Sequence, residues 1–593
     1  MRKILQLILL LCVYQGFSQD STWMTFYEKS DYKRTPRFTE TMDYCRRLAS
    51  VSSMIQVRSF GETAQGRQLP LVIVDKQGFT EPEKIRGAGR MILMIQACIH
   101  PGECEGKDAG LMLLRDIATT GKYTALLEHV SILFIPIFNV DGHERFGPYN
   151  RVNQNGPEEM GWRVNATNLN LNRDYMKADA PEMQSWLRLF SRWLPEFFID
   201  THTTDGADYQ YILTYYMNVA GGMEAGLTAW TKDVFLKNWK SGMEASGIPV
   251  FPYVEFRSWH DPKSGIDGGV SPPMLSQGYT ALRNRPGLLV ETHMLKTYKQ
   301  RVSATYECLV NVMKILDKEY ANLQDLERKA DAYTASAEFR QSPFPLTYKV
   351  LHNDSTMMDF LGISYTRNKS EITGDYWYKY GTEKETMKIP YFEKTAVQNS
   401  VTLPEAYIIP TEWRTLIERL KLHGVRVYRL TKETEFKVST YRFFNPKWQP
   451  TSYEGRHPLT SFDMEETTIT RTYPLGSAVI DMDQQAARVI ANLLEPRGNG
   501  SYLYWGFFDG IFEQKEYAEN YVMEELAKKM LAENPALKVE FEKKKQQDKS
   551  FATNPDAILN WFFSKTPYWD TRKDLYPVGR IMDRKTVNDL IKK

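Results

Sequence analysis

The sequence predicts an α/β fold, in which a mixed, largely parallel sheet is flanked by helices. Apolar runs with the composition of buried strands occur at residues 91–97, 130–138, 197–201 and 288–291. Segments with helical patterning lie between and after them, at residues 107–119, 180–194, 223–246 and 300–332. Strands that alternate with helices along a chain favour a sheet in which most strands run parallel.

A chain of 593 residues is too long for one hydrophobic core, so we expect at least two domains. The segment Ser342–Pro345, which contains two prolines, marks the predicted boundary. Beyond it the segments are shorter, more polar and β-prone, and residues 407–428 and 478–494 resemble pieces of alternating strand and helix. We therefore predict a first domain at 19–335 and a separate C-terminal α+β region at 345–593, an accessory region whose role the sequence does not indicate.

The first residues have the pattern of a secretory signal peptide. Arg2 and Lys3 precede a mostly apolar run at residues 4–14, and small residues at 16–18 stand before a cleavage point at Gln19. No later apolar stretch reaches the length of a membrane span. We predict a signal peptide at 1–18, export to the periplasm or the medium, and no stable membrane insertion once the signal is removed.

The composition is that of a folded globular protein, with 42% hydrophobic, 13% aromatic and 25% charged residues. Without Arg2 and Lys3 the chain keeps 73 Lys and Arg against 73 Asp and Glu. This balance gives no electrostatic reason to expect a nucleic-acid partner. The four cysteines that remain are too few for a disulfide framework in a chain of this size.

Two histidines closely follow predicted strands. The strand at 91–97 leads into His100-Pro101-Gly102-Glu103, where Pro-Gly supplies a turn that lets an imidazole and a carboxylate face one ion. The strand at 197–201 delivers His202. Two His and one Glu with a vacant fourth position form a catalytic rather than a structural zinc set. We predict one Zn²⁺ per chain, held by these three residues; Cys98 and Cys104 flank the loop but are not needed as ligands.

A third predicted strand, 288–290, ends in Glu291. In an open α/β sheet the ligand site lies beyond the carboxyl ends of the strands. It is hard to attribute to chance that three strands end beside a candidate site residue. These residues are His100 with Glu103, His202 and Glu291. Glu291 is therefore the candidate general base beside the predicted metal.

Between the predicted ligands lie Trp162-Arg163 and a run that contains Asn172-Arg173. With these residues the sequence resembles the zinc carboxypeptidases, peptidase family M14. That family has a His-x-x-Glu pair, an Arg upstream of an Asn-Arg pair, a distant third ligand His after a strand, and a Glu that ends a later strand. Here the same elements fall in the same order over about residues 40–320, which implies a zinc carboxypeptidase-like fold for the first domain.

The resemblance implies a role for each matching residue. His100, Glu103 and His202 match the zinc ligands. Glu291 matches the general base that takes a proton from the attacking water and passes it to the leaving amine, a role open to a glutamate whose surroundings raise its pKa. Arg163 matches the residue that stabilises the oxyanion of the tetrahedral intermediate, to which a guanidinium donates charge-assisted hydrogen bonds.

Asn172 and Arg173 match the pair that holds the terminal carboxylate of the substrate, which a guanidinium fork binds bidentately. The chain departs from the family pattern at two places. Asn170 stands where the family has an Asp that orients the first His ligand. Gly268-Gly269-Val270 stands near the position of the family's mobile substrate-binding Tyr; the nearest tyrosines, at 253 and 279, are not assigned to that role.

The predicted function is that of a metallocarboxypeptidase, a zinc-dependent exopeptidase that hydrolyses C-terminal amino acids from peptides. Its partner is a peptide or another amide with a free carboxylate. A zinc amidohydrolase of the same type, acting on peptidoglycan stem peptides or N-acyl amino acids, stays open because Arg173 suits any substrate with a free carboxylate. An inactive binding module also stays open, although the intact set His100, Glu103, His202 and Glu291 argues against it. The chain has no Gly-x-Ser-x-Gly segment, which disfavours a serine hydrolase.

Overall fold

The computed structural model describes residues 21–591. The predicted signal peptide, residues 1–18, lies outside the described residues. Within residues 21–591 there is no helix with the length and apolar character needed to cross a membrane. The chain forms two compact units, of which the first runs to Val401 and also includes Leu422–Gly424 and Gln484–Val489.

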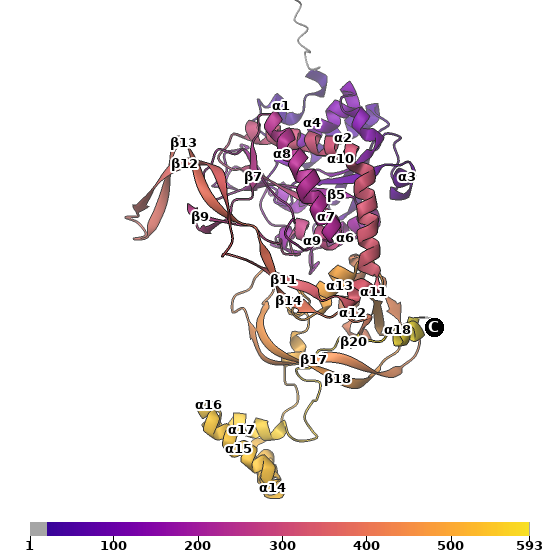
Figure 1. The fold of residues 1–593 in the computed structure, drawn as a ribbon, viewed down its shortest axis with the longest axis vertical. Coiled ribbons are helices and arrows are strands. Elements are labelled where there is room, and N and C mark those ends of the chain that lie inside the picture. The colour runs from indigo at the N-terminus through magenta and orange to yellow at the C-terminus, as the bar shows by residue number, and fades with distance from the viewer. Residues whose placement is uncertain (1–20, 592–593) are drawn as a thin grey trace, which may run out of the picture. The chain divides into compact units, whose positions relative to one another are not determined.

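An eight-stranded mixed sheet forms the centre of the first unit, in the order β1-β2-β4-β3-β5-β10-β6-β7. Two of its strands, β5 and β7, are labelled in Figure 1. Its four middle strands are parallel and correspond to the four predicted ones: β4 (Val130–Ile135), β3 (Met91–Gln96), β5 (Phe197–Thr204) and β10 (Gly287–His293). Antiparallel pairing adds β1 (Ile55–Glu62), β2 (Gln68–Val74) and β6 (Leu213–Tyr216), and β7 (Val250–Pro252) runs parallel to β6. The predicted mixed, largely parallel sheet flanked by helices is confirmed.

The middle strands are apolar throughout because helices cover both faces of the sheet. In β5, Phe197 and Ile199 belong to the large core cluster, whereas Phe198 points the other way and contacts Trp186. The helices of the large cluster are α2 (Phe38–Val51), α4 (Glu105–Thr120), α7 (Ala225–Trp230), α8 (Leu236–Ala245) and α10 (Tyr298–Ala335). On the Trp186 face lie α6 (Pro181–Trp193) and α9 (Ser276–Leu282), joined by the contact between Trp186 and Tyr279.

A second sheet in the first unit has the order β12-β13-β9-β8. Its long hairpin, β12 (Thr356–Lys369) and β13 (Tyr376–Phe392), pairs through β13 with β9 (Asp261–Asp267), which pairs with β8 (Phe256–Ser258). A separate two-stranded sheet joins β11 (Phe344–Val350) to β14 (Thr395–Val401). The first unit therefore continues past residue 335, where we expected the first domain to end, because strands from 344–401 pair with strands from the earlier part of the chain or with each other.

The second unit comprises Thr402–Lys421, Val425–Asp483 and the residues from Ile490 onward. Its six-stranded sheet has the order β16-β19-β15-β20-β17-β18 and is antiparallel at each pairing. The short strands are β15 (Ala406–Ile409), β16 (Tyr428–Arg429), β19 (Ala478–Asp481) and β20 (Gly579–Ile581). Most of the sheet area comes from the hairpin of β17 (Thr434–Trp448) and β18 (Leu459–Tyr473). Three helices, α14 (Asn520–Glu533), α15 (Pro535–Gln547) and α17 (Pro555–Phe563), form a small apolar cluster of their own. The predicted C-terminal α+β region is confirmed as a fold class, while its boundaries and its accessory role stay predictions.

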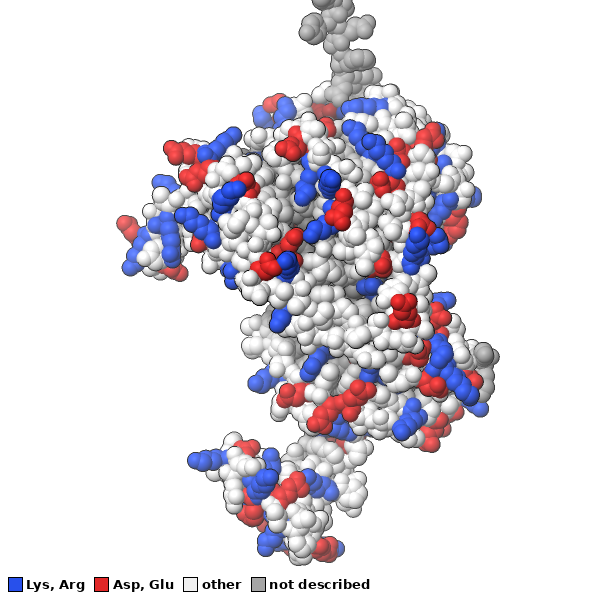
Figure 2. Space-filling model, viewed as in Figure 1, with Lys and Arg blue, Asp and Glu red and all other residues white. Residues whose placement is uncertain are grey.

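Charged side chains of both signs are interspersed over the face of the molecule drawn in Figure 2. This distribution is what the nearly equal numbers of basic and acidic residues predict. On that face no broad region of one sign is visible among the residues described.

The helix that follows the predicted metal loop lies unusually close to the sheet. Gly106, in the first turn of α4, has no side chain, and a Cβ built there would lie 1.9 Å from Oγ1 of Thr201 in β5. The absence of this one atom lets α4 begin directly against the strand that carries His202. The close approach fixes where the loop 97–104 ends relative to β5.

We expect Gly106→Ala to lower the free energy of unfolding of the first unit by about 1–3 kcal/mol, because the added methyl overpacks a filled space. The measurement is the midpoint of denaturant unfolding, monitored by near-ultraviolet circular dichroism. Gly87→Ala is the matched control, since a Cβ at Gly87 meets nothing within 4 Å. Equal midpoints for the two variants would show that the α4–β5 contact adapts without cost.

Candidate active site

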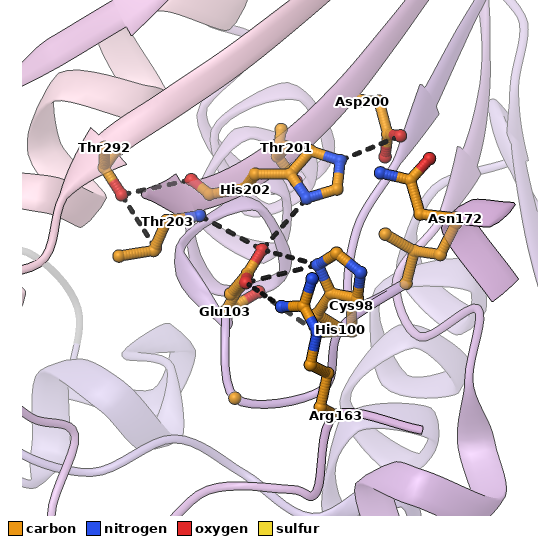
Figure 3. Close-up of polar contacts among 12 residues, drawn as sticks. Cys98, His100, Glu103, Arg163, Asn172, Asp200, Thr201, His202, Thr203 and Thr292 are labelled. Atoms are coloured by element: carbon orange, nitrogen blue, oxygen red, sulfur yellow. Dashed lines mark hydrogen bonds and ion pairs between the residues drawn. The ribbon is translucent and has the colours of Figure 1, made fainter. Parts of the chain in front are cut away.

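The three predicted metal ligands converge at the carboxyl ends of β3 and β5. His100 and Glu103 lie in the loop between β3 and α4, and His202 lies in β5. One ligand atom from each of the three residues can be chosen so that all lie within 4.8 Å of one another, and all three residues are buried. Figure 3 shows both imidazoles directed at the carboxylate of Glu103. The sequence spacing thus brings the predicted ligand set together.

The loop holds its shape through backbone contacts. The N–H of Glu103 donates to the carbonyl of His100 at 2.9 Å, which closes the turn expected from Pro101-Gly102. The N–H of Thr203 donates to Oε2 of Glu103 at 3.1 Å and ties the loop to the end of β5. Cys98 adopts a left-handed conformation, with φ of 57°, where the chain leaves β3.

Each imidazole is oriented by a polar partner at its Nε2 atom. His100 Nε2 lies 3.0 Å from Oδ1 of Asn170, and that oxygen also accepts from the backbone N–H of Asn172, so the ring must be the donor. His202 Nε2 lies 2.9 Å from Oδ2 of Asp200. The Nδ1 atoms of both rings face the carboxylate of Glu103, at 3.2 Å from His100 and 2.9 Å from His202.

Two imidazole nitrogens and a carboxylate that meet in a buried place form a set that can hold a metal cation. The charges around the set agree with this. Burial alone would raise the pKa of Glu103. The pKa nevertheless lies well below its ordinary value, because His100 and Arg151 stabilise the carboxylate anion. Burial lowers the pKa of His100 to about 4, so this ring is a neutral ligand at neutral pH. Nitrogen and carboxylate donors in this number fit zinc.

Glu291 lies in β10, directly opposite His202 in the parallel register of β5 and β10. It faces the cavity that His100, Glu103 and His202 also line. Burial raises the pKa of Glu291 to about 8, against the opposing influence of His202. A carboxyl group with a raised pKa in a cavity has the property needed for proton transfer near neutral pH.

The remaining predicted residues line the same cavity, whose volume is about 660 Å³: Arg163, Asn172 and Arg173. The side chain of Arg163 is 45% exposed and its Nη1 lies 3.5 Å from Oε1 of Glu103. Asn172 is held by the backbone N–H of Ser276, which donates to its Oδ1 at 3.4 Å. Nη1 of Arg173 donates to the carbonyl of Asn172 at 2.7 Å, so these two neighbours support one another. All seven predicted site residues therefore share one cavity.

Two residues at the site were not predicted from the sequence. Asp200 contacts His202, and the two-residue period of a strand, which places 200 and 202 on one face, is a signal that could have found it. Arg151 donates from Nη1 to Oε1 of Glu103 at 2.7 Å, and no local pattern marks it. Of the two unassigned tyrosines, Tyr253 lines the cavity, whereas Tyr279 is buried on the α6 face and contacts His423.

Cys98 and Cys104 are buried beside the loop and belong to its packing. Cys104 Sγ lies 3.1 Å from the carbonyl of Pro101, and Cys98 Sγ lies 3.7 Å from that of Glu103. Within residues 21–591, the group of three converging metal-ligating side chains is His100, Glu103 and His202, without either thiol.

The chain is similar in sequence to known carboxypeptidases. Residues 41–211 match the family model described as zinc carboxypeptidase. Carboxypeptidase 2 of Trichophyton rubrum is 23% identical over 496 residues, which cover 80% of this chain and 85% of the relative, and that of Trichophyton equinum is 24% identical over 503 residues, with the same coverage. A crystal structure of a metallo-carboxypeptidase from Burkholderia cenocepacia aligns with 47% of this chain and 69% of its own, at 16% identity and a TM-score of 0.35.

The matched segment, residues 41–211, contains His100, Glu103 and His202, and the fungal alignments extend well beyond it along the chain. The sequence resemblance to the zinc carboxypeptidases is thereby confirmed. Residues 41–211 thus form a zinc carboxypeptidase domain, and these similarities give the enzyme class as that of the metallocarboxypeptidases.

Proposed function

We propose that this protein is a zinc-dependent exopeptidase that removes C-terminal amino acids from peptides. The observation that carries the proposal is the convergence of three strand ends, with His100 and Glu103, His202, and Glu291, on one cavity that also holds three arginines. Zinc bound by His100, Glu103 and His202 would lower the pKa of a water and polarise the scissile carbonyl.

Residues of the chain supply the remaining functions, which are proton transfer, stabilisation of the oxyanion and binding of the substrate's terminal carboxylate. Glu291, whose pKa burial raises to about 8, takes a proton from the attacking water and delivers it to the departing amine. Arg163, partly exposed in the cavity, donates hydrogen bonds to the oxygen on which negative charge develops. Asn172 and Arg173 bind the terminal carboxylate of the substrate and so place the last peptide bond, and not an internal one, beside Glu291.

We further propose that residues 1–18 direct export to the periplasm or the medium. Within the mature protein, we assign catalysis to residues 19–335 and an accessory role to 345–593. The direct test of the substrate is incubation of the mature protein with a peptide library and mass spectrometry of the products. Loss of single residues from the carboxyl end supports the proposal, and cleavage of muropeptides or N-acyl amino acids alone replaces it with an amidohydrolase.

We expect one zinc per chain in the wild-type protein and loss of zinc in His202→Ala, because two ligands cannot hold the ion at a catalytic site. Elemental analysis after dialysis measures the content. His129→Ala is the matched control, since His129 lies away from the cavity and contacts Asp317 and Tyr320. Equal zinc in wild type and His202→Ala would remove His202 from the ligand set.

We expect Glu291→Gln to keep its zinc and to lose activity by at least about 10²-fold, because glutamine fills the same space and cannot accept a proton. Steady-state kinetics and zinc content are measured on the same preparation. Glu255→Gln is the control, because Glu255 lines the same cavity and has no role in the proposal. If Glu255→Gln were the inactive variant and Glu291→Gln turned over normally, the general base would be another carboxylate.

Replacement of Arg163 and of Arg173 should affect different kinetic constants of the enzyme. Arg163→Ala should lower kcat by about 10²–10³-fold, comparable to the loss of one oxyanion donor. Arg173→Ala should mainly raise KM, because the carboxylate that it binds is present in both substrate and transition state. Matched peptides with a free or an amidated C-terminus provide the readout. An unchanged preference for the free acid in Arg173→Ala would mean that another group recognises the terminus.

A further inference from the structure

The two oxygens of the Glu103 carboxylate have different surroundings. Oε2 receives the N–H of Thr203 and lies 2.9 Å from Nδ1 of His202. Nδ1 of His100 lies 3.2 Å from each oxygen. Oε1 alone is bound by a guanidinium, that of Arg151, at 2.7 Å. The carboxylate is thus held by a cation on one side while its other side faces the imidazoles.

Arg151 is itself fixed in place. Its Nη2 donates to the carbonyl of Thr203 at 3.1 Å, and only 13% of its side chain is exposed. The stem of Arg151 passes over the turn of the metal loop, where a Cβ on Gly102 would lie 2.4 Å from Cδ of Arg151. The glycine between the two ligands of the loop therefore leaves room for this arginine.

Arg163, the other guanidinium near Glu103, differs in each of these respects. Its Nη1 lies 3.5 Å from Oε1, too far for a well-formed hydrogen bond, and its side chain is 45% exposed. A buried carboxylate needs a close partner, because an unpaired buried charge is costly. With Arg151 in that role, Arg163 is left available to the cavity.

We propose that Arg151 is a positioning residue of the metal site: it holds Oε1 of Glu103 so that the carboxylate faces the two imidazoles, and it spares Arg163 for the substrate. Gly102 is part of this arrangement because its lack of a side chain leaves room for the aliphatic part of Arg151. The proposal rests on the zinc-dependent function proposed above. It adds to that function a group that acts on the metal site through Glu103.

The test is a double-mutant cycle read by zinc affinity, which does not depend on turnover. The dissociation constant for zinc is measured by competition with a chelator for wild type, Arg151→Ala, Gly102→Ala and the double variant. Arg151→Ala should weaken zinc binding about 10–100-fold, as expected when a partner that orients a ligand is lost. Gly102→Ala should weaken it as well, because the new methyl displaces Arg151. In the Arg151→Ala background, Gly102→Ala should weaken zinc binding little further, because the arginine side chain with which the methyl would clash is absent.

Arg145→Ala is the matched control, because Arg145 precedes the same segment and stacks on Trp162 instead of binding Glu103. Arg151→Lys should recover part of the affinity, since an ammonium can reach Oε1 but cannot also hold Thr203 with a rigid fork. Circular dichroism of the zinc-free proteins verifies that each variant is folded. At saturating zinc, Arg151→Ala should also lower kcat more than it changes KM, because Arg163 is drawn onto Glu103.

The outcomes separate this inference from the proposed function. If wild type binds no zinc, the proposed function fails and the inference fails with it. If wild type binds zinc and Arg151→Ala binds it equally well, the inference alone is overturned. Independent, additive effects of Gly102→Ala and Arg151→Ala would likewise overturn the coupling between the glycine and the arginine.

Discussion

Hydrogen bonding between the parallel strands β3, β5 and β10 sets where His202 and Glu291 lie and where the loop with His100 and Glu103 begins. In this register Glu291 stands opposite His202, and Gln96, the last residue of β3, stands opposite Asp200. The Nε2 of Gln96 donates to Oδ1 of Asp200 at 3.0 Å, just below the metal ligands. Because side chains alternate along a strand, a slip by one residue would turn His202 into the opposite helical layer. Burial of both faces of these strands makes such a slip costly.

The same physics explains which parts of the fold the sequence could predict. The four middle strands are continuous apolar runs, because both of their faces are covered, and they were predicted close to their observed bounds. Strands β1 and β6, at or near the edge of the sheet, mix buried and accessible residues or are only four residues long, and no comparable run marks them. The hairpin β12–β13 is largely exposed, and its β13 pairs with β9 between residues 125 positions apart in the sequence, which local patterning does not record.

For the site, residues at strand ends or within a family spacing could be predicted, whereas those that act through space could not. His100 and Glu103 closely follow β3, and His202 and Glu291 lie near the carboxyl ends of β5 and β10. Arg151 reaches Glu103 from a segment without regular structure. Asn170 takes the place at His100 that the family resemblance assigns to an acid, while an acid, Asp200, stands at His202. The two imidazoles are therefore electrostatically unequal: burial keeps the pKa of His100 low, whereas Asp200 raises that of His202 although burial opposes it.

The pairing of β13 with β9 has a consequence for how selectivity can change in this protein. The residues that follow β9, from Asp267 to Ser271, line the cavity together with Tyr391 of β13. The N–H of Gly268 donates to the carbonyl of Phe392, so this wall is attached to a hairpin that lies outside the matched family segment. The proposed catalytic residues, which lie between His100 and Glu291, and the hairpin that supports this wall are thus encoded in separate stretches of the gene. Insertions, deletions or exchanges in the hairpin can reshape the entrance for a new substrate while the chemistry is inherited unchanged.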